Sequence, residues 1–145
     1  MRILVADDDP TYRCLLQELL AKEFEIVLTC DGLEARDCLL GPNPPPIAII
    51  DWSMPGMDGF DLARFIRQTP EIEDTYVLMI TGQRSKEEMM RVLVCGADDF
   101  LLKPFDPMDL RIHLRTAVRM THLLQEVRSL RQGQVATAES ALPGA

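Results

Sequence analysis

Three aspartates stand where two short apolar segments of the sequence end. Asp7 and Asp8 follow the segment 2–6 (RILVA), and Asp51 follows the segment 47–50 (IAII). Carboxylate oxygens suit hard divalent cations, and a site with few protein ligands and several waters suits Mg²⁺. If the three side chains meet, their mutual repulsion favours protonation of at least one unless a cation offsets it. The acids therefore predict a Mg²⁺ site, with Mn²⁺ as the alternative metal.

Two further polar residues end later apolar segments. Thr81 follows the segment 76–80 (YVLMI), and Lys103 follows the segment 99–102 (DFLL). A hydroxyl and an ammonium beside metal-bound carboxylates can hold a phosphoryl group. A carboxylate in such a site can also act as a nucleophile and form an acyl phosphate. The five residues together predict phosphoryl chemistry, provided that the fold brings them to one place.

The elements that must position these residues alternate regularly. Five segments have the length and apolar character of strands buried on both faces, and helical patterns separate them. The strand-like segments are 2–6, 25–29, 47–50, 76–80 and 99–102. This alternation predicts a flavodoxin-like, doubly wound α/β fold with a parallel five-stranded sheet in the order 2-1-3-4-5. In that order the ends of the first and third strands meet at the switch point, where such folds bind ligands.

The motifs LVADDDP, IIDWSMPGMDG, MITG and GADDFLLKPF occur in this order, and residues 1–119 resemble a response-regulator receiver domain of two-component signalling. The resemblance implies that Asp51 accepts a phosphoryl group from a histidine kinase or a phosphotransfer protein. It implies that Mg²⁺ binds Asp8 directly, Asp7 mainly through water, Asp51, and the backbone carbonyl of Ser53. The side chains of Ser53 and Gln83 match positions that tune the lifetime of the phosphoryl group.

The resemblance also assigns the switch. Thr81 would move its hydroxyl onto a phosphoryl oxygen, Lys103 would pair with the phosphate, and Phe100 would turn inward as the threonine moves. The Lys103–Pro104 bond would be cis, which costs little before proline. A receiver is a signalling domain that catalyses only its own phosphorylation and dephosphorylation, so we do not expect an enzyme.

Two other functions fit parts of the sequence. DDDPT matches the pattern of haloacid-dehalogenase-type phosphatases, with Asp7 as nucleophile and Asp9 as acid, but Lys103 follows the later acidic pair where that family needs it before, and Asp51 would be idle. A flavodoxin-type electron carrier shares the fold, but its first loop must hold a phosphate, which DDDP would repel.

The remaining acids receive structural interpretations. Asp9 precedes PT at the start of a helical pattern, so we expect it to cap that helix. Asp98 and Asp99 are expected in a solvated turn.

The last helix is predicted to begin at about Pro107 and to continue beyond the domain. Met120, Leu123, Val127 and Leu130 repeat at 3-4-3 spacing, which defines an extension over 120–132. This stripe predicts either a short parallel coiled coil that joins two receivers or a frayed amphipathic tail. Residues 133–145 are small and polar, typical of a linker or disordered tail. The segment 92–120, which leads into this leucine-bearing helix, resembles receivers that precede diguanylate cyclase, phosphatase or kinase-type outputs.

Composition limits the other classes. The formal charge of −8 argues against direct nucleic-acid binding, which needs clustered Lys and Arg. The chain shows no apolar run of the roughly 20 residues that cross a bilayer and no signal peptide, so a cytoplasmic location is expected. Four cysteines without a CxxC pair predict reduced thiols within the core.

Overall fold

The chain forms a five-stranded parallel sheet in a computed structural model that describes residues 1–82 and 85–141, with the side chains of the last helix described as far as residue 133. The strands are β1 (Arg2–Ala6), β2 (Glu25–Thr29), β3 (Ile47–Asp51), β4 (Tyr76–Thr81) and β5 (Asp99–Leu102). Their order is β2-β1-β3-β4-β5, and each neighbouring pair is parallel. The predicted flavodoxin-like α/β fold and strand order are confirmed.

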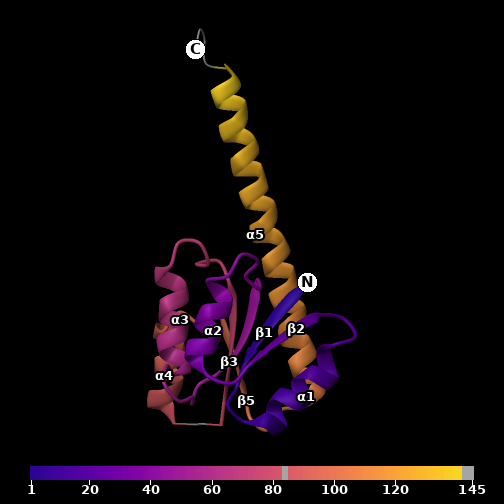
Figure 1. Ribbon diagram of the computed structural model, residues 1–145, viewed down its shortest axis with the longest axis vertical. Coiled ribbons are helices and arrows are strands. Elements are labelled where there is room, and N and C mark those ends of the chain that lie inside the picture. Colours follow the sequence, from indigo (N-terminus) through magenta and orange to yellow (C-terminus); the bar gives the residue numbers. More distant parts are fainter. Residues whose placement is uncertain (83–84, 142–145) are drawn as a thin grey trace.

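Helices cover both faces of this sheet (Figure 1). They are α1 (Pro10–Leu20), α2 (Gly32–Leu39), α3 (Gly59–Gln68), α4 (Lys86–Val94) and α5 (Pro107–Ala141). Alternate residues of β1 point to opposite faces: Leu4 joins the core under α2, α3 and α4, whereas Ile3 joins the core under α1 and α5. Because both faces are covered, the interior positions of the strands are apolar.

The four helices that follow β1, β2, β3 and β4 begin at a side chain that accepts a backbone N–H, and Asp106 accepts the N–H of Met108 at the start of α5. The carboxylate of Asp9 accepts from Thr11 at the start of α1, which confirms its predicted capping role. Asp31, Asp58 and Ser85 cap α2, α3 and α4 in the same way. Because these caps lie in the loops that follow β1, β2, β3 and β4, they fix where each helix starts beside the carboxyl edge of the sheet.

The last helix is longer than predicted. α5 begins at Pro107, as expected, but runs to Ala141 instead of ending near residue 132. The segment 134–141 (QVATAESA) contains Ala, Gln and Glu, which favour a helix as readily as they suit a linker. Residues 142–145 of the predicted tail lie outside the described part of the chain. Across the described ranges, no helix has both the length and the apolar character needed to cross a membrane.

The prediction that every cysteine is a core thiol is wrong for two of the four. All four thiols are free, but Cys14 and Cys30 are exposed and only Cys95 is buried. The sequence pattern placed Cys14 in a helix, but it did not show whether this residue lies on the exposed or the buried side of that helix.

Asp98 and Asp99 do not lie in a merely solvated turn. One Asp98 carboxylate oxygen lies 2.5 Å from a guanidinium nitrogen of Arg67 and accepts the backbone N–H of Val77. Asp99 begins β5 and contacts the ring nitrogen Nδ1 of His113 on α5. Both acids are therefore structural contacts between elements, so this prediction is corrected.

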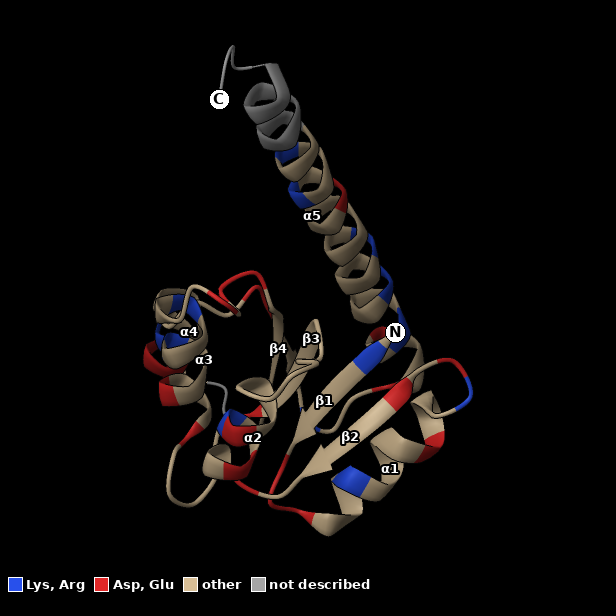
Figure 2. Ribbon diagram, turned by 45° about the horizontal axis from the view of Figure 1, so that its top comes forward, with Lys and Arg blue, Asp and Glu red and all other residues tan. Residues whose placement is uncertain are grey.

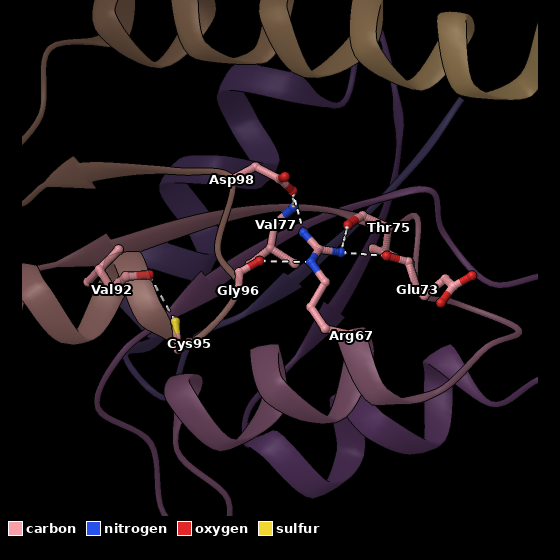
Figure 3. Close-up of polar contacts among 8 residues, drawn as sticks. All are labelled: Arg67, Glu73, Thr75, Val77, Val92, Cys95, Gly96 and Asp98. Atoms are coloured by element: carbon pink, nitrogen blue, oxygen red, sulfur yellow. Dashed lines mark hydrogen bonds and ion pairs between the residues drawn. The ribbon is translucent and has the colours of Figure 1, made fainter. Parts of the chain in front are cut away.

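Arg67 at the end of α3 is the centre of this arrangement (Figure 3). Its guanidinium donates to the carbonyl of Gly96 in the loop before β5, at 2.8 Å, and to the carbonyls of Glu73 and Thr75 in the loop before β4, at 2.8 and 2.6 Å. With Asp98, a single side chain thus joins α3 to two loops at the amino-terminal edge of the sheet.

Replacing Arg67 with alanine should therefore destabilise the fold. Arg67→Ala leaves half-buried carbonyls and the Asp98 carboxylate without their donor, and because the ion pair is partly exposed we expect a loss of about 2 kcal/mol in the free energy of unfolding. Urea unfolding followed by circular dichroism measures it. Arg64→Ala, on the exposed side of the same helix, is the matched control and should change stability by less than about 0.5 kcal/mol. Equal losses in the two variants would contradict the role assigned to Arg67.

Candidate functional site

Three carboxylates meet at the carboxyl edge of the sheet. Asp51 is the last residue of β3, and Asp7 and Asp8 directly follow β1, the strand beside it. Oxygen atoms of all three lie within 4.8 Å of one another. Asp7 and Asp51 are buried, with exposed fractions of 2% and 8%, whereas Asp8 is exposed. The cluster thus has a buried floor and one acid at its open side.

The backbone around these acids is closely packed. The N–H of Gly59, the first residue of α3, donates to the carbonyl of Trp52 at 2.8 Å. A Cβ added to Gly59 would lie 2.5 Å from the carbonyl oxygen of Asp51. The loop after β3 can therefore return so close to the end of that strand only because residue 59 has no side chain.

Lys103 reaches the acids from the end of β5, which β4 separates from β3 in the sheet. It follows β5, and its ammonium lies 2.9 Å from a carboxylate oxygen of Asp7 and 3.5 Å from one of Asp51. Its backbone N–H donates to the carbonyl of Thr81 at 2.8 Å, which joins the ends of β4 and β5. The Lys103–Pro104 bond is cis. The ammonium is thus shared between the acids that follow β1 and β3.

An aromatic ring also contacts the lysine. The Lys103 ammonium lies 3.9 Å from the centre of the Tyr12 ring, on the first turn of α1, and that ring packs at 5.9 Å against Phe105. A cation over an aromatic face is attracted by the ring quadrupole. The sequence analysis missed Tyr12 because its neighbours in the chain suggest only an amphipathic helix, and no local pattern places it over a residue 91 positions later.

Burial and charge determine the protonation of the cluster. Burial first, and then the charge of Asp7, raise the pKa of Asp51 to about 7, although Lys103 opposes both effects. Burial alone would lower the pKa of Lys103, but its hydrogen bond to Asp7 and the charge of Asp51 outweigh burial and leave this pKa raised. One ammonium therefore does not fully offset the acids, and the site favours an additional cation.

The donor set fits a hard divalent metal. The three carboxylates offer only oxygen ligands, and the exposed position of Asp8 leaves room for waters, as Mg²⁺ prefers. Once a cation offsets the acids, an anion can lie beside the Lys103 ammonium. The arrangement can hold a metal and a phosphoryl group against the Asp51 carboxylate.

The structure describes three of the other four predicted site residues. Thr81 is buried at the end of β4, with an exposed fraction of 2%. Phe100 in β5 is half-buried and packs against the core under α2, α3 and α4. Ser53 is exposed in the loop after β3. Gln83 lies outside the described residues.

Trp52, next to Asp51, is half-buried and packs edge-on against Phe60 of α3, with ring centres 4.9 Å apart. On the other side of Phe60, the guanidinium of Arg91 in α4 lies 4.4 Å from the ring centre. These contacts connect the loop after Asp51 with α4.

Comparisons with known proteins agree with this geometry. Residues 3–115 match the response regulator receiver domain family. The phosphate regulon transcriptional regulatory protein PhoB of Rhizobium meliloti is 34% identical over 119 residues, which cover 81% of this chain and 52% of PhoB. A chemotaxis protein CheY homolog of Campylobacter jejuni is 31% identical over 113 residues, which cover 77% of this chain and 87% of that protein.

The comparison with solved structures also finds a receiver domain. The signal receiver domain of a signal transduction histidine kinase from Syntrophus aciditrophicus superposes with a TM-score of 0.76 at 30% identity, covering 81% of this chain and 89% of that one. An adenylate cyclase structure from Rhodopirellula baltica gives a TM-score of 0.80 at 27% identity, covering 90% and 96%. The chain spans about half the length of PhoB and of the transcriptional regulatory protein AruR of Pseudomonas aeruginosa, 52% and 49%. With the family match over most of its length, this chain belongs to the response regulator receiver domains of two-component signalling.

Proposed function

We propose that this receiver accepts a phosphoryl group on Asp51 in a Mg²⁺-dependent reaction. The observation that carries the proposal is the convergence of Asp7, Asp8, Asp51 and Lys103 at one edge of the sheet, with Asp51 buried at the end of β3. Asp51 is the one acid of the cluster that ends a strand. Its carboxylate is therefore held rigidly, whereas Asp8 is exposed.

The donor is a histidine kinase or a phosphotransfer protein that carries phosphohistidine. A carboxylate oxygen of Asp51 attacks phosphorus, the bond from phosphorus to the imidazole nitrogen breaks, and the imidazole leaves with the electron pair and takes up a proton. The product is an acyl phosphate, which water later hydrolyses. Attack requires the ionised carboxylate, so the raised pKa of Asp51 makes the cation part of the chemistry.

Mg²⁺ would be held by Asp8, by Asp7 through water, by Asp51 and by the backbone carbonyl of Ser53. When bound, it neutralises charge on the phosphoryl oxygens and on the acids. The Lys103 ammonium would supply a second positive charge. Contacts with Tyr12 and Asp7 hold this ammonium in place.

Thr81 and Phe100 form the proposed switch. The Thr81 hydroxyl turns to a phosphoryl oxygen, and Phe100 turns further inward into the space that the threonine leaves. Because Phe100 has no hydroxyl, packing alone drives this rotation. The face formed by α4, β5 and α5 changes with it, and so does the pairing of α5. Ser53 and Gln83 tune the lifetime of the acyl phosphate through hydrogen bonds.

The alternatives receive less support. The family match does not support the haloacid-dehalogenase-type phosphatase, and the Asp9 carboxylate that would serve as its acid caps α1. The receiver sequence match also leaves the electron carrier without support. We propose a cytoplasmic signalling domain, without enzymatic turnover of another substrate or direct contact with nucleic acid, that controls an output domain or a partner protein.

Substitution of Asp51 tests the proposal. After incubation with acetyl phosphate and Mg²⁺, the wild-type chain should gain the mass of one phosphoryl group in intact-mass spectrometry, and Asp51→Asn should gain none. Asp37→Asn, an exposed acid on α2, is the control and should behave as wild type. EDTA should abolish the gain. Phosphorylation of Asp51→Asn at the wild-type level would contradict the assignment.

The raised pKa of Asp51 predicts a pH-dependent stability in metal-free protein. The pKa of Asp51 in the folded state, about 7, lies above the ordinary aspartate value of 3.8. The folded state therefore binds more protons between these values, and stability falls as the pH rises through this window. From pH 5 to pH 8, wild type should lose on the order of 2 kcal/mol more than Asp51→Asn in urea unfolding with EDTA.

Mg²⁺ should reduce this difference, because it favours the ionised carboxylate. Parallel stability curves of wild type and Asp51→Asn without metal would show that Asp51 is not the titrating acid.

A further inference from the structure

An apolar stripe follows α5 beyond the body of the domain. Four residues of this stripe, at 3-4-3 spacing, are exposed: Met120 (43%), Leu123 (50%), Val127 (43%) and Leu130 (62%). The end of α5 projects from the body of the domain (Figure 1), whereas Met120 and Leu123 lie where the helix still borders the domain. Apolar side chains in a continuous row on an exposed helix indicate a surface that is covered by a partner.

The stripe cannot be covered by rotation of α5 onto its own domain. A different side of the helix already contacts the body: Leu114 and Ala117 are buried in the core, and Thr121 one turn later is 4% exposed. Farther along, the guanidinium of Arg128 lies 2.8 Å from the carboxylate of Asp74 in the loop before β4. These contacts fix the rotation of α5 about its axis and leave each of the four stripe residues at least 43% exposed.

The stripe has the residue types of a two-stranded coiled coil. In heptad notation Met120 and Val127 occupy a positions, and Leu123 and Leu130 occupy d positions. A β-branched residue at a with leucine at d favours a parallel dimer over higher oligomers. Since α5 is already ordered by the domain, pairing does not have to nucleate the helix.

Charges beside the stripe specify the partner. Glu126 occupies the g position and Arg131 the following e position, and these positions meet across the interface of a parallel, in-register pair. Two copies of this chain would form the Glu126–Arg131 pair twice. No ion pair among the described side chains uses either residue. Elsewhere the described part of α5 is mainly basic, as the Lys and Arg colouring in Figure 2 shows. Glu126 therefore selects for a partner helix that carries a basic residue at the facing position.

The opposite orientation is disfavoured by the same residues. An antiparallel pair that keeps apolar layers between Met120 and Leu130 and between Leu123 and Val127 would place the two Glu126 side chains against each other. Like charges in facing positions destabilise a helical pair. The sequence of α5 therefore distinguishes the two orientations.

We infer that the stripe binds a second copy of this chain, as a parallel, in-register coiled coil over 120–131 with reciprocal Glu126–Arg131 pairs. The pairing itself requires no phosphoryl chemistry. Only its modulation by Asp51 rests on the proposed function.

Charge reversal tests the partner, the orientation and the register in the full chain. Sedimentation equilibrium should detect a dimer of wild type, and Glu126→Arg and Arg131→Glu should each weaken it about tenfold, because two attractive pairs become repulsive. The double variant should regain an affinity within about threefold of wild type. An equimolar mixture of the two single variants should form a heterodimer, since each chain then faces the opposite charge.

The matched control is Ser129→Arg, which adds the same charge at an exposed c position, outside the pairing surface, and should leave the dimer intact. A wild-type chain that stays monomeric, a tenfold loss in Ser129→Arg, or a double variant that remains as weak as the single ones would overturn the inference. Every variant should still be phosphorylated by acetyl phosphate, so a failure of pairing is distinguishable from a failure of the proposed function.

Discussion

The site depends on the sharing of one ammonium between two buried carboxylates. Asp7 directly follows β1 and Asp51 ends the neighbouring strand β3, and ionisation of either carboxyl beside the other is unfavourable without a positive charge. Lys103 supplies it from β5, which lies beyond β4 in the sheet. Only a long side chain reaches across the end of an intervening strand, which explains why the cation is a lysine and why the Tyr12 ring supports it. Because the Lys103 ammonium offsets only part of the negative charge of the acids, the site favours a further cation.

The carboxyl edge and the amino-terminal edge of the sheet have different roles. The acids and Lys103 lie at the carboxyl edge, whereas Arg67 joins α3 to the loops before β4 and β5 at the amino-terminal edge. One of those loops contains Asp74, which pairs with Arg128 of α5. The loop before β4 is thus in contact with both α3 and α5. In the proposed function, these contacts are a candidate route for coupling between the domain and the projecting end of α5.

The sequence predicted the parts of this structure that depend on local pattern. The alternation of apolar strands and helices predicted the sheet order. The acids after the first and third strands then predicted the carboxylate cluster, because the carboxyl ends of parallel strands meet at one edge. Contacts made by long side chains between distant segments escaped prediction. Arg67 and Asp98 look like ordinary surface charges in the sequence, and only the fold brings them together. The end of α5 was misjudged because small polar residues are compatible with both helix and linker.

The length of α5 determines how a change at Asp51 can reach the pairing surface. A single helix contacts β5 through the His113–Asp99 pair and carries the stripe from Met120 onward. A rearrangement of β5 that moves the base of α5 must therefore displace the stripe as well, because no break separates the two parts. In the proposed function, phosphorylation would change dimer affinity only by as much as the two states of the α4, β5 and α5 face differ in their fit to the paired helices. A short coiled coil suits such control, since a modest difference in that fit can shift a weak association substantially, whereas a long coil would pair in either state.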